Sequence, residues 1–246
     1  MLEAMTSWRL TMDAIARARP CGPDAGATRR EVPIALDLRF DALTPGIGTD
    51  GQAGAGPRSD VARATSGTVG KGHFEQAGRW SGSVVVDGQR LEWGAAARGN
   101  RDRSWGPRRW GGPRMWRWFS INVDDDLHFG GIRLGTDAGD LHRGWVWADG
   151  RATSVAAWRI RTELADDALT HRVVHLEVED KRGHHHSLRA DVLRVAALGG
   201  PGDTLVNEGL ARWTLLGTEG SERAGYGICE YLHQLDDAGR PVVPVE

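Results

Sequence analysis

The chain has 246 residues, and its 31 Lys+Arg and 33 Asp+Glu give a formal net charge of −2. A chain of this length can bury a sizeable core, and a balance so close to neutrality excludes a basic field that would recruit nucleic acid or an anionic membrane. No run of about 18 apolar residues occurs, so we expect no transmembrane helix. The first 17 residues lack the apolar core of a signal peptide, and we therefore expect a cytoplasmic location.

In chain order, residues 7–18 are the one plausible helix, although their apolar spacing also fits a strand. Residues 32–40 alternate apolar and polar side chains, which predicts a strand with one buried face. Residues 44–70 are rich in Gly, Ala and Ser and indicate a linker. Within them, Gly46–Gly51 fits G-x-G-x-x-G, but no helical pattern follows to hold a pyrophosphate, so we interpret it as a loop.

The rest of the chain repeats the period of two. Residues 80–86 and 89–93 form a predicted hairpin around Asp87-Gly88, and further strands are predicted up to residue 234. About ten evenly spaced strands favour an all-β antiparallel barrel or sandwich. We therefore divide the chain into a partial N-terminal β segment (1–43), a linker (44–70) and a β-barrel domain (71–246).

Residues 98–118 hold four tryptophans, seven arginines and the single carboxylate Asp102. Packing arginines and tryptophans around one carboxylate costs desolvation that ordinary cores avoid. The cluster therefore indicates a functional site. The alternative is a structural Asp–Arg–Trp clasp that pins a loop onto the barrel.

The segment from Arg101 to Arg108 reads R-D-R-S-W-G-P-R. Together with the run His73–Gly82, the segment Gly144–Gly150 and the tail Glu208–Leu232, it resembles the C-terminal half of AttH-like proteins. These form a lipocalin-type superfamily that includes carotenoid 1,2-hydratases. The resemblance covers roughly residues 70–235, and its most specific element is R-D-x-S-W-G-P-R. It implies a lipocalin-like antiparallel barrel with an apolar cavity, and hydration or cyclisation of isoprenoid-like substrates.

Two departures from the family pattern matter. Arg103 stands where the family usually has histidine, which puts proton chemistry at that position in doubt. The family usually has two lipocalin-like halves, and here the first 65 or so residues resemble only the end of the first half. The chain is either shortened or completed by another subunit, and exposed strand edges favour a homodimer.

Two carboxylates are the catalytic candidates. Asp102 lies among tryptophans that could raise its pKa and stabilise a cation, but neighbouring arginines favour its ionised form as a base or a structural partner. Glu230 is a buried acid beside the cavity if its strand face points inward, and otherwise a salt bridge at the rim. The expected ligand-binding residues are His73, Arg103, Trp105, Trp116, Trp118, Trp145 and Tyr226. The tryptophan pairs also fit an ordinary core, and His73 a structural histidine.

Other signals are weaker. His184-His185-His186 could contribute to a zinc site, but its place at a hairpin turn favours solvent-exposed side chains, and we expect no metal. Cys21 and Cys229 have no metal or redox spacing, so we expect free thiols, with a disulfide between them as the alternative.

Three functions fit these residues. The first is a hydratase, isomerase or cyclase that needs no cofactor and acts on an apolar, isoprenoid-like molecule in a tryptophan-lined barrel cavity. The second is a binding protein that carries a hydrophobic ligand unchanged. The third is a structural remnant whose cavity has collapsed onto its own side chains.

Overall fold

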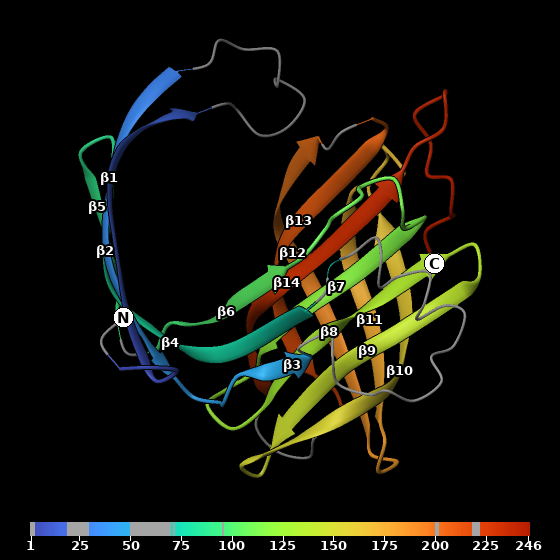
Figure 1. The fold of residues 1–246 in the computed structure, drawn as a ribbon, viewed down its shortest axis with the longest axis horizontal. Coiled ribbons are helices and arrows are strands. Elements are labelled where there is room, and N and C mark those ends of the chain that lie inside the picture. Colours follow the sequence, from blue (N-terminus) through green and yellow to red (C-terminus); the bar gives the residue numbers. More distant parts are fainter. Residues whose placement is uncertain are drawn as a thin grey trace. The chain divides into compact units, whose positions relative to one another are not determined.

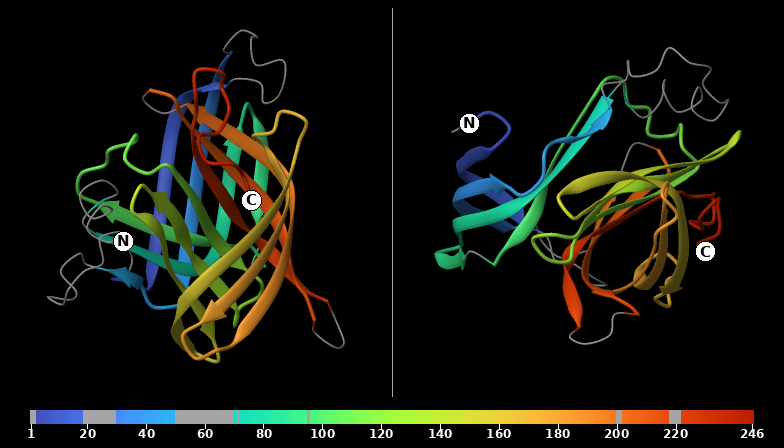
Figure 2. Two further views of the ribbon diagram at one scale, coloured as in Figure 1. Left: turned by 90° about the vertical axis from the view of Figure 1, so that its right-hand side faces the viewer. Right: turned by 90° about the horizontal axis from the view of Figure 1, so that it is seen from below.

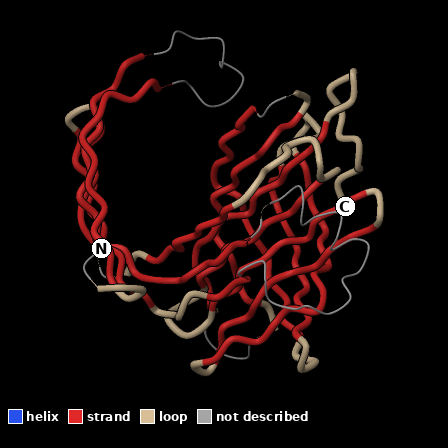
Figure 3. The backbone as a smooth tube through the Cα atoms, in the orientation of Figure 1, coloured by secondary structure: helices blue, strands red, loops and turns tan. Residues whose placement is uncertain are grey.

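A computed structural model describes residues 3–18, 30–49, 70, 72–94, 96–199, 202–217 and 222–246. All of its regular elements are strands, and Figure 3 draws no helix among the described residues. This confirms the all-β prediction. None of the described segments forms a helix long and apolar enough to cross a membrane.

The chain divides into two compact units (Figure 1). The first, called here the sheet unit, comprises residues 1–46 and 76–101, and the second, the barrel unit, comprises residues 47–75 and 102–246. The sequence had placed residues 76–101 with the barrel. Their strands instead pair with the N-terminal segment, so the chain passes between the two units along strands rather than through one linker.

The sheet unit is antiparallel. β1 (Ser7–Ala18) pairs with β2 (Arg30–Ala42), β2 with the later part of β4 (Gly72–Val86), and β4 with β5 (Gln89–Trp93). The helix considered for residues 7–18 is wrong. Trp8, Leu10 and Met12 lie opposite Phe40, Leu38 and Leu36, so one face of the pair is apolar, as the period of two requires.

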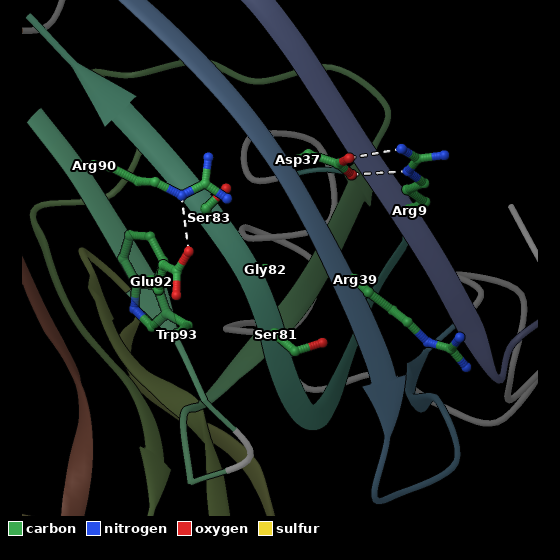
Figure 4. A pocket seen from close by; sticks show the side chains of 9 residues that line it. All are labelled: Arg9, Asp37, Arg39, Ser81, Gly82, Ser83, Arg90, Glu92 and Trp93. Atoms are coloured by element: carbon green, nitrogen blue, oxygen red, sulfur yellow. Dashed lines mark hydrogen bonds and ion pairs between the residues drawn. The ribbon is translucent and has the colours of Figure 1, made fainter. Parts of the chain in front are cut away.

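The opposite face of this sheet is charged. Figure 4 shows a pocket on it where Arg9 forms two hydrogen bonds with Asp37 and Arg90 pairs with Glu92. The Arg9 and Asp37 side chains are 59% and 52% exposed. Ion pairs this exposed contribute little to stability, and this pocket holds none of the candidate site residues.

The barrel unit contains a closed antiparallel barrel of eight strands that follow one another around it, with the last paired to the first (Figure 2). These strands are β7 (Met115–Asn122), β8 (His128–Thr136), β9 (Gly139–Ala148), β10 (Arg151–Leu164), β11 (His171–Asp180), β12 (His185–Gly199), β13 (Thr204–Leu215) and β14 (Arg223–Gln234). The predicted strands between residues 115 and 234 are therefore confirmed.

Large side chains pack together in the barrel interior. Trp158, Trp213, Phe119 and Tyr231 are at most 1% exposed and belong to one core cluster. Trp158 lies against Gly131 and Gly144, where a Cβ atom would come within 2.8 and 2.6 Å of its ring. Both glycines have positive φ angles, 151° and 156°, so a larger residue would be strained as well as crowded.

The barrel unit also carries three short pieces of strand. They are β3 (Ile47–Thr49), the first residues of β4, and the last residues of β6 (Arg98–Trp105). Ile47 and Gly48 pair with Glu75 and Phe74. Most of the predicted linker, the last two residues of the G-x-G-x-x-G match and Cys21 lie outside the described residues. Cys229 is a free, buried thiol inside the barrel.

Candidate functional site

The candidate tryptophans lie on the outer face of the barrel strands. On β7, Phe119 and Ile121 belong to the interior core, whereas Trp116 belongs to a second cluster with Trp118 packed against it. On β9, Val146 faces the interior, so its neighbour Trp145 faces outward. The expectation that these tryptophans line the barrel cavity is therefore wrong. The interior is occupied by tryptophans from other strands.

Glu75 is the centre of this outer face. Its carboxylate accepts hydrogen bonds from the indole N–H of Trp118 at 2.6 Å and of Trp145 at 3.0 Å. Glu75 is 2% exposed, and a Cβ atom on Gly130 would come within 2.1 Å of its Oε2 atom. The glycine on β8 therefore leaves the space in which the carboxyl group lies.

His73 connects Glu75 to Asp102. The two residues on β4 are separated by one position, so both side chains point to the same side. His73 Nε2 lies 3.8 Å from Glu75 Oε1 and is hydrogen-bonded to Asp102 Oδ2. The side chains of His73 and Asp102 are 38% and 46% exposed, so this end of the group meets solvent while Glu75 is enclosed.

The electrostatics of this group place a titration near neutral pH. Burial raises the pKa of Glu75 to about 7, against the opposing effects of His73 and the two indole N–H groups. Burial lowers the pKa of His73, but the hydrogen bond with Asp102 and the charges of both carboxylates outweigh it, so that pKa is raised. Glu75 therefore changes its ionisation around neutral pH directly beside a histidine whose pKa is raised by the same carboxylates.

Glu230 belongs to a second acidic pair on the same outer face. It lies directly opposite Glu208 on β13 and accepts a hydrogen bond from the indole N–H of Trp116. Burial and the neighbouring Glu208 raise the pKa of Glu230 to about 8. Cys229 and Tyr231 belong to the core inside the barrel, so Glu230 lies on the outer face, where it is half-buried, and not in the barrel interior.

The other candidates are not brought to Glu75. Trp105 packs near Phe74, with ring centroids 6.5 Å apart, and a Cβ atom on Gly72 would collide with its ring. Because successive side chains of β4 point to opposite sides, Gly72 and Phe74 face away from His73 and Glu75, and Trp105 lies on that opposite side. Arg103 shares the Trp105 side of β6. Tyr226 is 55% exposed near the start of β14.

Glu75 was not among the candidates chosen from the sequence. The available signal was the pattern His73-x-Glu75 on a strand. Its burial depends on Gly130, Trp118 and Trp145, which are distant in sequence. Among the described residues, no group of three or more His, Cys, Asp or Glu side chains is placed to hold a metal ion. His184 hydrogen-bonds Asp180 and is 62% exposed.

Replacing Gly130 by Ala tests how tightly the Glu75 site is built. We expect the added methyl group to displace the Glu75 carboxyl or the Trp145 ring, and to destabilise the protein by about 1–3 kcal/mol, the usual cost of overpacking. Urea unfolding measures this effect. Gly199→Ala is the matched control, because a Cβ atom there meets nothing within 4 Å. Equal stability of the two variants would contradict the placement of Glu75.

The raised pKa values also predict how stability depends on pH. Glu75 and Glu230 hold their protons more tightly in the folded protein than in the unfolded chain, where the usual value is 4.5. As pH rises from 6.5 to 8.5 the folded state must release protons that the unfolded chain has already lost, so stability falls. We expect a loss on the order of 2 kcal/mol, most of it from Glu230. Urea unfolding at both pH values, with Glu230→Gln flattening the slope, checks this. A stability that is constant or rises over this range would contradict it.

The protein is thus an eight-stranded antiparallel barrel that carries a histidine–carboxylate group on its outer face, with the buried carboxyl group of Glu75 held by two indoles. The family model of DUF7064, a domain of unknown function, matches residues 1–235, and the chain belongs to that family. No curated protein matches the sequence.

Three solved structures share the fold. Kievitone hydratase from Nectria haematococca is 13% identical with a TM-score of 0.52, and the match covers 89% of this chain and 64% of the hydratase chain. CghA in complex with Sch210972 is 16% identical with a TM-score of 0.54, covering 89% and 73%. An AttH protein from Nitrosomonas europaea is 17% identical with a TM-score of 0.56, covering 93% and 66%. The chain thus spans about two thirds of these structures, and its resemblance to AttH-like proteins is confirmed for the fold.

Proposed function

We propose that this protein is an acid–base enzyme that protonates a carbon–carbon double bond of an apolar small molecule and adds water to it, or rearranges it, without a cofactor. The observation that carries the proposal is the Glu75 carboxyl group. This carboxyl group is buried, is held by two indole N–H groups and has a pKa of about 7. It lies beside the more exposed pair His73–Asp102.

An acid with a pKa near the operating pH is the most effective proton donor that remains substantially protonated there. In the proposed hydration, the O–H bond of Glu75 breaks and a C–H bond forms on the substrate. Water then attacks the resulting carbocation. The proton released from that water passes to the carboxylate of Glu75, directly or through His73, so that the sum is alkene plus water to alcohol.

The indoles of Trp118 and Trp145 have a second role in this proposal. Their N–H edges are committed to Glu75, and the proposal assigns a ring face of each indole to the reacting part of the substrate. The face of an aromatic ring carries negative potential and stabilises a cation by about 0.5–2 kcal/mol. A carbocation formed next to Glu75 would therefore lie where the site stabilises it.

The similar structures support the same chemistry. One of them is named a hydratase, and another was solved with the ligand Sch210972, whose presence supports recognition of a small organic molecule by this fold. The isoprenoid-like substrate rests on the AttH-like sequence motif around Asp102. In this proposal Asp102 orients His73 and is not the proton donor, a role we assign to Glu75.

Deuterium labelling tests the proposal before a substrate is known. The protein is incubated in D2O with a panel of terpenes, carotenoid fragments and other polyenes, and each compound is analysed by mass spectrometry. Reversible protonation of carbon places deuterium on the substrate even when hydration is thermodynamically unfavourable. We expect label in at least one compound, together with a hydrated product. Quenching of tryptophan fluorescence without any label would support a ligand-binding protein instead and overturn the enzymatic proposal.

A further inference from the structure

The polar end of the barrel interior contains a buried arginine that the proposed reaction does not use. Arg117 on β7 is 0% exposed, and its Nη1 atom donates to the carbonyl oxygens of Trp116 and Leu232 at 2.9 and 3.1 Å. Its Nε and Nη2 atoms are buried and have no hydrogen-bond partner among the described residues. A buried guanidinium with two free donors is costly unless an acceptor completes it.

The two free donors are adjacent on the guanidinium. The N–H bonds of Nε and Nη2 point in parallel along one edge, which is the fork that binds the two oxygens of a carboxylate. Glu246 forms an ion pair with Arg117, but its Oε2 atom is 3.6 Å from Nη2, beyond hydrogen-bond distance. The Oε1 atom of Glu246 instead accepts a hydrogen bond from Arg133 at 2.9 Å.

Two buried histidines lie at the same end of the barrel. His233 is 1% exposed, and neither ring nitrogen has a partner among the described side chains and backbone. His171 stacks on the Tyr231 ring at 4.3 Å, and Arg117 also lies 4.3 Å from that ring. The Nε2 atom of His171 bonds the Cys229 carbonyl, which leaves Nδ1 unpaired within the described structure.

We propose that Arg117 and His233 form a binding site for a planar oxyanion of the carboxylate type inside the barrel. The ligand would accept both N–H bonds of the Arg117 fork and a third from His233. The site is separate from the Glu75 site, because Arg117 and Glu75 lie on opposite sides of β7. Glu246, the ion-pair partner of Arg117, is 23% exposed, and the proposal takes this residue as the point of entry for the ligand.

The positive charge of Arg117 acts on both histidines. Burial is the main cause that lowers the pKa of His233, to about 3, and the charge of Arg117 is the second. Burial also lowers the pKa of His171, to about 4, with Arg117 again contributing. Neutral histidines leave Arg117 as the principal cation of this cluster. A bound anion would offset that charge and raise the pKa of His233.

Thermal unfolding with added anions tests the site. Sodium formate is titrated into the protein at constant ionic strength, with sodium chloride as the reference salt, and hexanoate as the same head group on a longer chain. We expect formate to raise Tm saturably by several degrees, roughly as RT ln(1 + [L]/Kd) predicts. Tighter binding of hexanoate would identify the head group of a longer acid as the ligand. Weaker binding would identify a small free anion.

Variants make the assignment specific. Arg117→Lys keeps the charge but not the fork, and we expect its apparent Kd for formate to rise at least about ten-fold. Glu246→Gln removes the nearest competing carboxylate and should lower it. Arg172→Lys, at an exposed position on β11, is the matched control and should leave it unchanged. If Arg117→Lys does not fold, the imidazole resonances of His233 decide, because formate should shift them in the unmodified protein. No saturable effect on Tm, an equal effect in Arg117→Lys, or unchanged His233 resonances would each overturn the proposal.

Discussion

Replacing Glu75 by Gln is expected to slow deuterium incorporation by about 10²–10⁴-fold, the usual contribution of a general acid. The amide cannot donate the proton that the buried carboxylic acid supplies. Its side chain is nearly the same size, so the barrel should remain folded. The rate is measured by mass spectrometry on the compound that the unmodified protein labels.

Glu163→Gln is the matched control for this variant. Glu163 lies on β10 with its side chain 55% exposed, and we expect this substitution to leave the labelling rate unchanged. A Glu75→Gln protein that is folded and retains the full rate would remove Glu75 from the mechanism. The same result with a lost rate in Glu230→Gln would transfer the role of proton donor to the second acidic pair.

Replacing Trp158 by Ala is expected to cost about 3–5 kcal/mol of folding free energy, as for other large aromatic residues in packed cores. Trp158 is 1% exposed, its ring centroid lies 5.6 Å from that of Phe119, and its indole N–H donates to the Arg143 carbonyl at 2.9 Å. The cavity and the unpaired carbonyl act in the same direction. Tm should fall by roughly 10 °C in thermal unfolding.

Trp93→Ala provides the comparison, because Trp93 is 39% exposed on the sheet unit. Its loss should change Tm much less. A barrel that tolerates Trp158→Ala as well as Trp93→Ala would contradict the packing of Trp158 in the barrel core.

The sequence predicted the strands well because alternation is a local property. The period of two between residues 32 and 40, and again along β7 to β14, reflects one buried face per strand. The helix considered for residues 7–18 failed because its apolar spacing was compatible with both periods. Only the pairing of this segment with β2 decides between a helix and a strand, and that pairing joins residues 12 to 34 positions apart, from Ala18 with Arg30 to Ser7 with Asp41.

The site was predicted only in part, for a similar reason. Alternation shows that Trp116 and Trp118 share a face, but it does not say which face of the strand meets the barrel interior. That choice follows from the packing of Phe119 against Trp158 and Trp213, which come from distant strands. The burial of Glu75 likewise depends on residues more than 40 positions away. Asp102 was selected for its local arginines, whereas the structure bonds it to His73.

The most direct test of the central claim is the ionisation of Glu75, followed by the carboxyl carbon resonances of protein labelled with ¹³C-glutamate. We expect one resonance that titrates with a pKa near 7 and is missing from Glu75→Gln, separate from the resonance of Glu230 near 8. If the resonance lost in Glu75→Gln titrates instead near 4–5, as exposed glutamates do, Glu75 is not the neutral-pH acid that the proposed chemistry requires.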